Sequence, residues 1–148
     1  MNNETRQRRN YAGLFRRLFA IFYDSFLLLA ILFIVSAIAN ALNHGEAIQP
    51  GDRFYPLYVL SLFLLAYLYF AWFWIHGGQS LGMKTWRIRL YRENNKAITW
   101  KTAAVRFVTA LLSWGVCGLG FLWALFDAKK RCWHDISSGT VLLDLREK

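Results

Sequence analysis

The feature that most constrains the fold is a long apolar run at residues 18–39, LFAIFYDSFLLLAILFIVSAIA, which follows the pair Arg16-Arg17. As a helix this run would be about 33 Å long, enough to cross a hydrocarbon core of about 30 Å. A second run at residues 57–75 has a similar length and carries no charge. Apolar blocks of this length predict membrane-spanning helices, because the apolar residues of a soluble core are interleaved with polar ones.

The first run also has features of a secretory signal, since basic residues precede it and a small-residue triplet at 37–39 ends it. The apolar part of such a signal is usually about 7–15 residues long. Because the run is longer than this and contains Asp24, we expect an uncleaved span.

A third apolar run at residues 107–126 allows two paths. A single crossing would move the basic residues 129–131 outside the cytoplasm, although basic loops usually stay inside. It would also separate two strand-like segments, residues 86–91 and 140–145, which we expect to pair on the cytoplasmic side. We therefore favour a hairpin of two short helices and keep the single crossing as the alternative. The turn would use Gly115, Gly118 and Gly120, and the arms would cover residues 99–114 and 119–133.

Basic residues cluster beside the ends of these runs and dominate the formal net charge of +9. Residues 1–16 and the segment 76–106 are strongly basic, whereas the loop at 40–56 is not. The charge rule therefore places the N-terminus and the segment 76–106 in the cytoplasm and the loop outside. This placement predicts attraction to anionic lipid head groups. It argues against nucleic-acid binding, which needs a basic face on a folded soluble surface.

These features predict an all-α polytopic membrane protein, with two full transmembrane helices, a hairpin of two shorter helices and a small cytoplasmic β element. The chain divides into a basic cytoplasmic N-terminal segment, residues 1–16, and a membrane domain, residues 17–145. The two cysteines, Cys117 and Cys132, provide neither a disulfide framework nor a CxxC motif.

Asp24 is the sharpest clue to function, because a charged carboxylate at membrane depth costs about 2.5–3.5 kcal/mol on insertion scales. It should face protein or water, or be protonated. Arg17 lies two helical turns earlier on the same face, but the two Cα atoms would be about 10.5 Å apart along the helix axis. A third group or a water is therefore expected between them, and Arg106 is the obvious side chain. We expect basic neighbours from elsewhere in the fold to hold Asp24 in place.

The segment at 77–85, GGQSLGMKT, is similar to a phosphate-binding loop. However, Met83 separates the last glycine from the lysine, and a strand-like stretch follows where the motif requires a helix. We therefore predict a tight cytoplasmic turn that contains Gly78, Gln79 and Gly82, and no nucleotide site.

The C-terminal polar residues do not form a recognisable catalytic or metal-binding motif. His134 and Asp135 lack a nucleophile elbow around the nearby serines, and Asp135 is expected to accept backbone N–H groups or to pair with a basic side chain. The three histidines are scattered, and Cys132 with His134 forms only a lone pair, so we predict no metal site and no cofactor. We expect a protein that is not an enzyme.

Several of these residues, taken in order, resemble the RDD family of small bacterial membrane proteins. Arg17 and Asp24 resemble its opening, and Arg106 matches the arginine that opens its later helix. The segment GQSLGMK at 78–84, with the residues 87–89, resembles its Gly-Gln-Thr-Leu-Gly-Lys turn and the following strand. Here Ser80 stands for the usual threonine, and Met83 separates Gly82 from Lys84.

The end of the chain strengthens the resemblance, which covers roughly residues 17–145. Residues 127–141 resemble the closing motif of the family, with Asp135 taken as its second aspartate and Asp127 as the other candidate. The resemblance implies a multi-pass helical protein of the bacterial inner membrane, and the family's biochemical function is largely unassigned. The predicted charged cluster comprises Arg17, Asp24, Arg106 and Asp135, with Asp127 and Lys84 as further candidates.

We expect an accessory or scaffold module, oligomeric or bound to membrane partner proteins, whose charged cluster fixes helix packing at the inner leaflet. Gly120 and Ala124 form a small-xxx-small pair of the kind that supports helix association. The alternative is a cation/proton-coupled transporter or antiporter in which Asp24 titrates and a monovalent cation or proton moves; transport of this type has been suggested within the family. Three or four thin helices leave little room for a path, so transport would require assembly.

Overall fold

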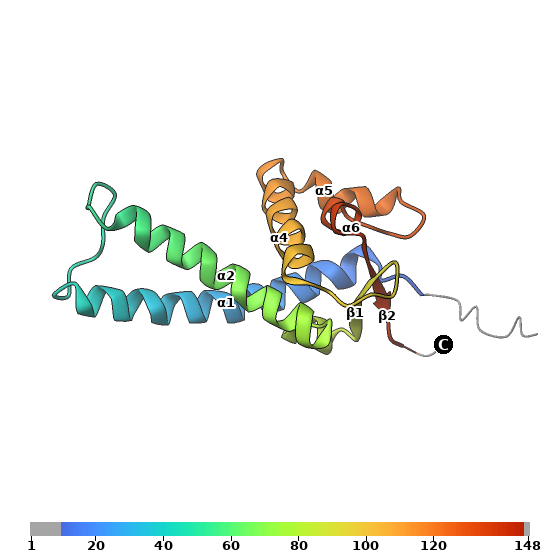
Figure 1. Cartoon of the computed structure of the whole chain (residues 1–148), viewed down its shortest axis with the longest axis horizontal. Coiled ribbons are helices and arrows are strands. Elements are labelled where there is room, and N and C mark those ends of the chain that lie inside the picture. The colour runs from blue at the N-terminus through green and yellow to red at the C-terminus, as the bar shows by residue number, and fades with distance from the viewer. Residues whose placement is uncertain (1–9, 147–148) are drawn as a thin grey trace, which may run out of the picture.

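Two long helices dominate the structure, a computed structural model that describes residues 10–146. Helix α1 covers Leu14–Leu42 and helix α2 covers Tyr55–Gly77, with 29 and 23 residues. They are about 43 and 34 Å long, so each can cross a bilayer. Figure 1 shows them extending together away from the rest of the molecule. The apolar runs predicted to span the membrane lie within these helices.

The surface of the helix pair is apolar over most of its length. Helix α1 buries only Arg17, Ala20 and Asp24, all in its N-terminal half, and α2 buries only Ala71 and Trp74 near its C-terminal end. Beyond these positions the helices expose many large apolar side chains, among them Phe26, Leu29, Phe33, Ile34, Ile38, Leu57 and Leu60. An apolar surface of this extent belongs in lipid, so the chain is a membrane protein.

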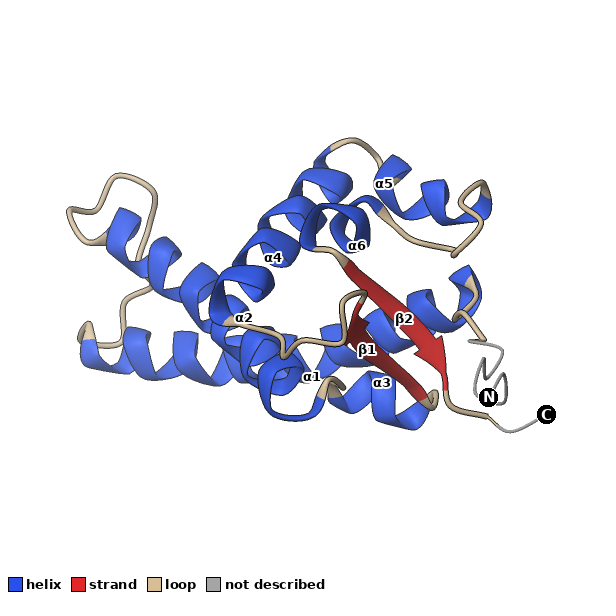
Figure 2. Ribbon diagram, turned by 45° about the vertical axis from the view of Figure 1, so that its right-hand side comes forward, coloured by secondary structure: helices blue, strands red, loops and turns tan. Residues whose placement is uncertain are grey.

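A small antiparallel sheet forms the other end of the molecule. Strand β1, Ile88–Arg92, pairs with β2, Thr140–Asp144, in a register that places Leu90 opposite Leu142. This confirms the predicted pairing of 86–91 with 140–145, with small shifts of the strand ends. Figure 2 shows the sheet at the end of the molecule that lies away from the loop joining α1 and α2. The short helix α3, Leu81–Thr85, connects α2 to β1.

The core lies between the sheet and the buried ends of the helices. Ile88, Leu90 and Leu142 project from the sheet into a cluster that includes Trp74 of α2 and Ala103 of helix α4, Trp100–Gly115. Ile88 and Leu90 are buried and Arg89 between them is exposed, as expected for a strand with one face on a core. The N-terminal segment also joins the sheet, since Tyr11 forms a bridge with Leu143.

The third apolar run is broken. Helix α4, Trp100–Gly115, is followed by α5, Leu119–Leu122, and by a 3₁₀ turn, Trp123–Leu125, and the two parts are bent by 110°. The predicted first arm at 99–114 agrees with α4 within a residue. The predicted second arm at 119–133 is wrong, because helix ends at Leu125 and residues 126–132 are irregular before α6, Trp133–Ser138. The side of the membrane on which this part lies stays a prediction.

The break has a local cause at each end. Cys117 and Gly118 adopt left-handed backbone conformations, with φ of 55° and 77°, which a continuous helix does not contain. After Leu125, the Asp127 carboxylate accepts the backbone N–H groups of Lys129 and Arg131 at 3.0 and 3.1 Å. These bonds satisfy backbone N–H groups within a turn, and the turn therefore competes with continuation of the helix.

The small-residue pair of this run packs inside the protomer. A Cβ atom on Gly120 would collide with the side chain of Ser113 and approach the ring of Trp133 to 3.0 Å. Ala124, one helical turn later, is also buried. Gly120 therefore allows α5 to approach α4 and α6, and both small residues are buried within the protomer.

The buried sheet face should account for much of the stability of this end of the molecule. We expect Ile88→Ala to lower the free energy of unfolding by about 2–5 kcal/mol, because it opens a cavity beneath a fully buried side chain. Leu145→Ala, at an exposed position just after β2, is the matched control and should change it by less than about 1 kcal/mol. Thermal or denaturant unfolding in detergent measures both, and equal effects would contradict this view of the core.

Candidate functional site

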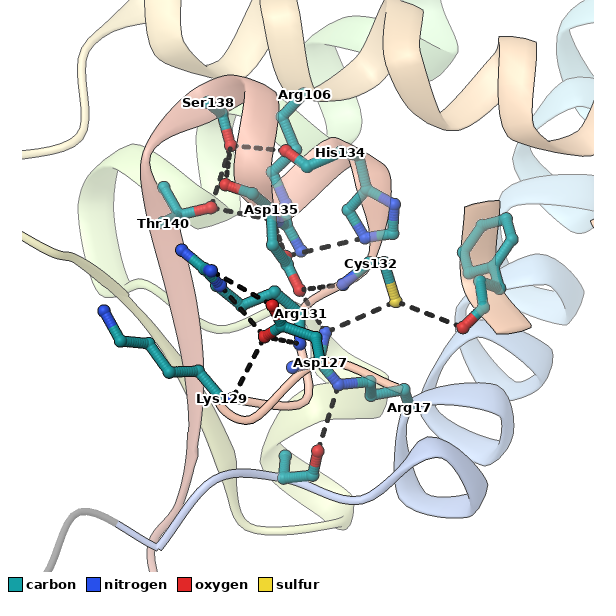
Figure 3. Close-up of polar contacts among 12 residues, drawn as sticks. Arg17, Arg106, Asp127, Lys129, Arg131, Cys132, His134, Asp135, Ser138 and Thr140 are labelled. Atoms are coloured by element: carbon teal, nitrogen blue, oxygen red, sulfur yellow. Dashed lines mark hydrogen bonds and ion pairs between the residues drawn. The ribbon is translucent and has the colours of Figure 1, made fainter. Parts of the chain in front are cut away.

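Three charged side chains from three helices meet in the interior, and we refer to Arg17, Arg106 and Asp135 as the charged centre (Figure 3). Arg17 comes from α1, Arg106 from α4 and Asp135 from α6. The Nη1 atom of Arg17 donates to Oδ2 of Asp135, and the Nη1 atom of Arg106 donates to Oδ1. Arg17 and Arg106 are 3% exposed and Asp135 is fully buried. Both oxygens of one carboxylate therefore join three helices.

Further hydrogen bonds fix the geometry of the charged centre. Arg17 Nε donates to the carbonyl oxygen of Ala12 at 3.1 Å, and Arg106 Nη1 donates to Thr140 Oγ1 at 3.0 Å. Asp135 is the third residue of α6 and accepts the backbone N–H of Cys132 at 3.1 Å. The Arg106 guanidinium also lies over the Trp74 ring, 5.0 Å from its centroid, which adds a cation–π contact to α2.

Burial and the charged centre together determine the protonation of Asp135, His134 and Cys132. Burial raises the pKa of Asp135, but Arg106 and Arg17 lower it by more, so the pKa lies well below its ordinary value and the carboxylate is ionised. Burial lowers the pKa of His134 to about 3, so its imidazole is neutral. Burial raises the pKa of Cys132 to about 11, which keeps its thiol protonated.

Cys132, His134 and Asp135 place potential ligand atoms within 4.8 Å of one another. These residues do not fit a metal cation. Both oxygens of Asp135 already accept from guanidinium groups, whose charges would repel a cation.

Asp24 is held by a separate set of donors. It is 2% exposed and accepts hydrogen bonds from the Ser80 hydroxyl, the backbone N–H of Gly82 at 2.8 Å and the Tyr69 hydroxyl at 3.4 Å. The expectation that basic side chains hold Asp24 is therefore wrong. Arg17 does share a buried helix face with Asp24, but its guanidinium pairs with Asp135, toward the N-terminal end of α1.

The turn that holds Asp24 is the predicted turn at 77–85. Gly78 ends α2 with a left-handed φ of 65°, and its carbonyl accepts the N–H of Leu90 at 2.7 Å. Gln79 Nε2 donates to the carbonyl of Ile88 at 2.9 Å, which ties the turn to β1. Ser80 caps α3, because its hydroxyl accepts the N–H of Met83 at 3.3 Å.

Gly82 is required by close approach. A Cβ atom there would collide with the carbonyl oxygen of Ala20 and lie 2.9 Å from Asp24 Oδ2. The similarity of this turn to a phosphate-binding loop thus has a structural basis, because its backbone N–H and hydroxyl do bind an anionic group. The group is the carboxylate of Asp24 from α1.

A cavity of about 140 Å³ connects the charged centre with Asp24. Arg17, Asp24, Arg106 and His134 contribute to its polar part. Its apolar walls come from α1, α2, α4, α5 and the sheet, and include Ile21, Phe70, Ile88, Phe107, Leu111, Trp114 and Phe121. The four residues of the predicted charged cluster are therefore close in space, although their charges are satisfied at two different places.

The two further candidates lie outside this interior. Asp127 is part of a surface network in which its carboxylate accepts Arg131 Nε and Nη2, both at 3.0 Å. Lys84 is exposed on α3. We did not predict Ser80, Trp74 or Thr140 as partners of buried charges from the sequence. The signal for Ser80 was present, since a hydroxyl before a glycine in a turn is a suitable donor for a buried carboxylate.

Comparison with known protein families gives a match over most of the chain. The model of the RDD family matches residues 11–139, which is nearly the whole chain and includes every residue of the charged centre and the turn at 77–85. No curated protein and no solved structure matches the chain.

Removing the negative charge of the charged centre should be strongly destabilising. We expect Asp135→Asn to lower the free energy of unfolding by about 3–5 kcal/mol, because it leaves two buried guanidinium groups without their counter-charge. Asp127→Asn, which breaks a partly exposed pair, should cost about 1 kcal/mol or less. Unfolding in detergent compares the two, and a similar loss for both would contradict the role of burial.

Stability should fall as the pH is lowered from about 6.5 towards 3. The unfolded chain protonates His134 near its ordinary pKa of 6.5, whereas the folded protein resists protonation until about 3, so acid favours the unfolded state. Asp135 acts in the same direction below its ordinary pKa of 3.8, because its folded pKa is also lowered. Unfolding temperatures between pH 7.5 and 4 measure the slope, and His134→Gln should flatten it above about pH 4. A variant with the same slope as the wild type would refute this assignment.

Proposed function

The chain belongs to the RDD family, and we propose that it is an accessory or scaffold module of the bacterial inner membrane. In this proposal the N-terminus lies in the cytoplasm, and α1 and α2 anchor a rigid cytoplasmic-side unit made of the sheet, α3 and α6. The module acts by presenting this unit to a membrane partner protein or to further copies of the chain. Anionic lipid head groups contact the basic residues beside the membrane.

One observation carries the proposal: both oxygens of Asp135 are bound by guanidinium groups from α1 and α4. The buried charges therefore satisfy one another across helices, an arrangement that fixes how the helices pack. A buried ion pair often adds little to the net free energy of unfolding but can specify one arrangement of the helices. We propose that the charged centre has this role. Asp24 acts similarly, since it attaches α1 to the turn between α2 and β1.

A second candidate function is cation/proton-coupled transport. The observation that favours it is the position of Asp24, a buried carboxylate on the wall of the cavity. Within residues 10–146 no cationic side chain pairs with Asp24, so a change in its charge would not break an ion pair. The scaffold proposal is preferred because the donors around Asp24 come from the fold itself.

Flux measurements separate the two functions. Purified protein in liposomes that contain a pH-sensitive dye should show no cation-dependent proton movement above that of empty liposomes. Asp24→Asn should instead lower the unfolding temperature, because an amide replaces an acceptor of the Ser80 and Gly82 donors. Asp127→Asn is the matched control, which should leave the flux unchanged and lower the unfolding temperature by less than Asp24→Asn does.

The opposite result is equally clear. Proton movement that depends on an added monovalent cation, and that Asp24→Asn abolishes while the protein stays folded, would replace the scaffold proposal with transport.

A further inference from the structure

Four buried nitrogen atoms, on residues that line the cavity, lack a hydrogen-bond partner among the residues that the structure describes. They are Nη2 of Arg17, Nε of Arg106, Nε1 of Trp74 and Nδ1 of His134. All four residues line the cavity, and none is more than 6% exposed. Buried polar atoms are rarely left unpaired, since each costs about 1–3 kcal/mol. Four at one cavity therefore indicate a ligand.

The chemistry of these atoms defines what they can bind. Guanidinium and indole N–H groups are donors only, and neutral imidazole can donate through Nδ1. The ligand must therefore supply oxygen acceptors. Within the charged centre, two guanidinium groups share the single negative charge of Asp135, whereas the Asp24 carboxylate, which also lines the cavity, is bound by the Ser80 and Gly82 donors. A group with a negative charge and two or more oxygens fits both requirements.

The remaining walls require an apolar part. Phe70, Phe107, Leu111, Trp114 and Phe121 line the cavity beside the donors. Leu111 and Trp114 are also 42% and 59% exposed on the outer side of α4, so the cavity reaches the apolar surface of that helix. A cavity of about 150 Å³ accepts a guest the size of benzene. At about 140 Å³, this cavity holds a head group and its first carbons, and a longer chain must leave past Leu111 and Trp114.

We propose that this cavity binds the carboxylate or phosphate head of a membrane amphiphile, with Arg17, Arg106, Trp74 and His134 as donors and the alkyl chain leaving along α4. The exposed apolar side of α4 is suited to contact with lipid, where such ligands would be present at high local concentration. The inference stands on the cavity alone and does not require either proposed function.

The test is binding to the purified full chain in a neutral detergent, measured by native mass spectrometry and titration calorimetry. Palmitate and hexadecyl phosphate carry a carboxylate and a phosphate head group on alkyl chains of the same length. Hexadecanol has this alkyl chain without a charged head group. Acetate and inorganic phosphate provide the charged groups without a long alkyl chain. We expect one molecule of palmitate or of hexadecyl phosphate per chain. Hexadecanol and the free anions should bind at least about tenfold more weakly.

Two variants test the location. Ala110→Phe places a ring at the cavity wall and should weaken palmitate binding at least about tenfold, whereas Leu112→Phe, on the exposed side of the same helix, should leave it unchanged. Trp74→Phe removes one donor but keeps an aromatic ring beneath Arg106, and should weaken binding about tenfold. Because Trp74→Phe is a conservative change, it tests the site even where Ala110→Phe does not fold.

Three results would overturn the proposal. Equal binding of hexadecanol and palmitate would show that the charged head is not recognised. Binding of inorganic phosphate or acetate as tight as that of the amphiphiles would show a small-anion site without a chain. Absence of binding, or palmitate binding that neither Ala110→Phe nor Trp74→Phe changes, would leave water as the partner of the unpaired donors.

Discussion

The arrangement of the helices depends on one buried carboxylate with two arginine partners. Asp135 accepts Arg17 from α1 and Arg106 from α4, and its own helix leads directly into β2. Neither arginine could stay at this depth without the carboxylate, and the carboxylate could not stay without them. The packing of α1, α4 and α6 and the position of the sheet therefore follow from a single charge balance.

The second buried acid solves the same physical problem in another way. Asp24 uses the hydroxyl and backbone donors of a glycine-containing turn, which are neutral and rigid. Because Asp24 has these donors, the arginines pair with Asp135, and each arginine keeps one buried nitrogen atom without a partner among the described residues. The unpaired arginine nitrogens are thus a consequence of how the two acids divide the available partners.

The sequence predicts the features that follow from local residue patterns or from the thickness of the bilayer. The spans follow from run length, the strand pair follows from alternation, and the family follows from ordered motifs such as Arg17 and Asp24. The partners of the buried charges cannot be predicted from the sequence. The helical spacing of Arg17 and Asp24 indicates that both lie on one face, but it does not show which distant segment packs opposite each of them. The second arm at 119–133 failed for a local reason, since the hydrogen bonds of Asp127 close a turn that apolar content does not reveal.

The order in which the ribosome delivers these groups has a consequence for biogenesis. Arg17 and Asp135 are separated by 118 positions in the chain, and the bridge between Tyr11 and Leu143 closes across a similar span. The first helix must therefore enter the bilayer before its counter-charge has been synthesised. Until Asp135 has been synthesised, Arg17 can be accommodated only by head groups, water or the insertion machinery, and the charged centre can assemble only after that point.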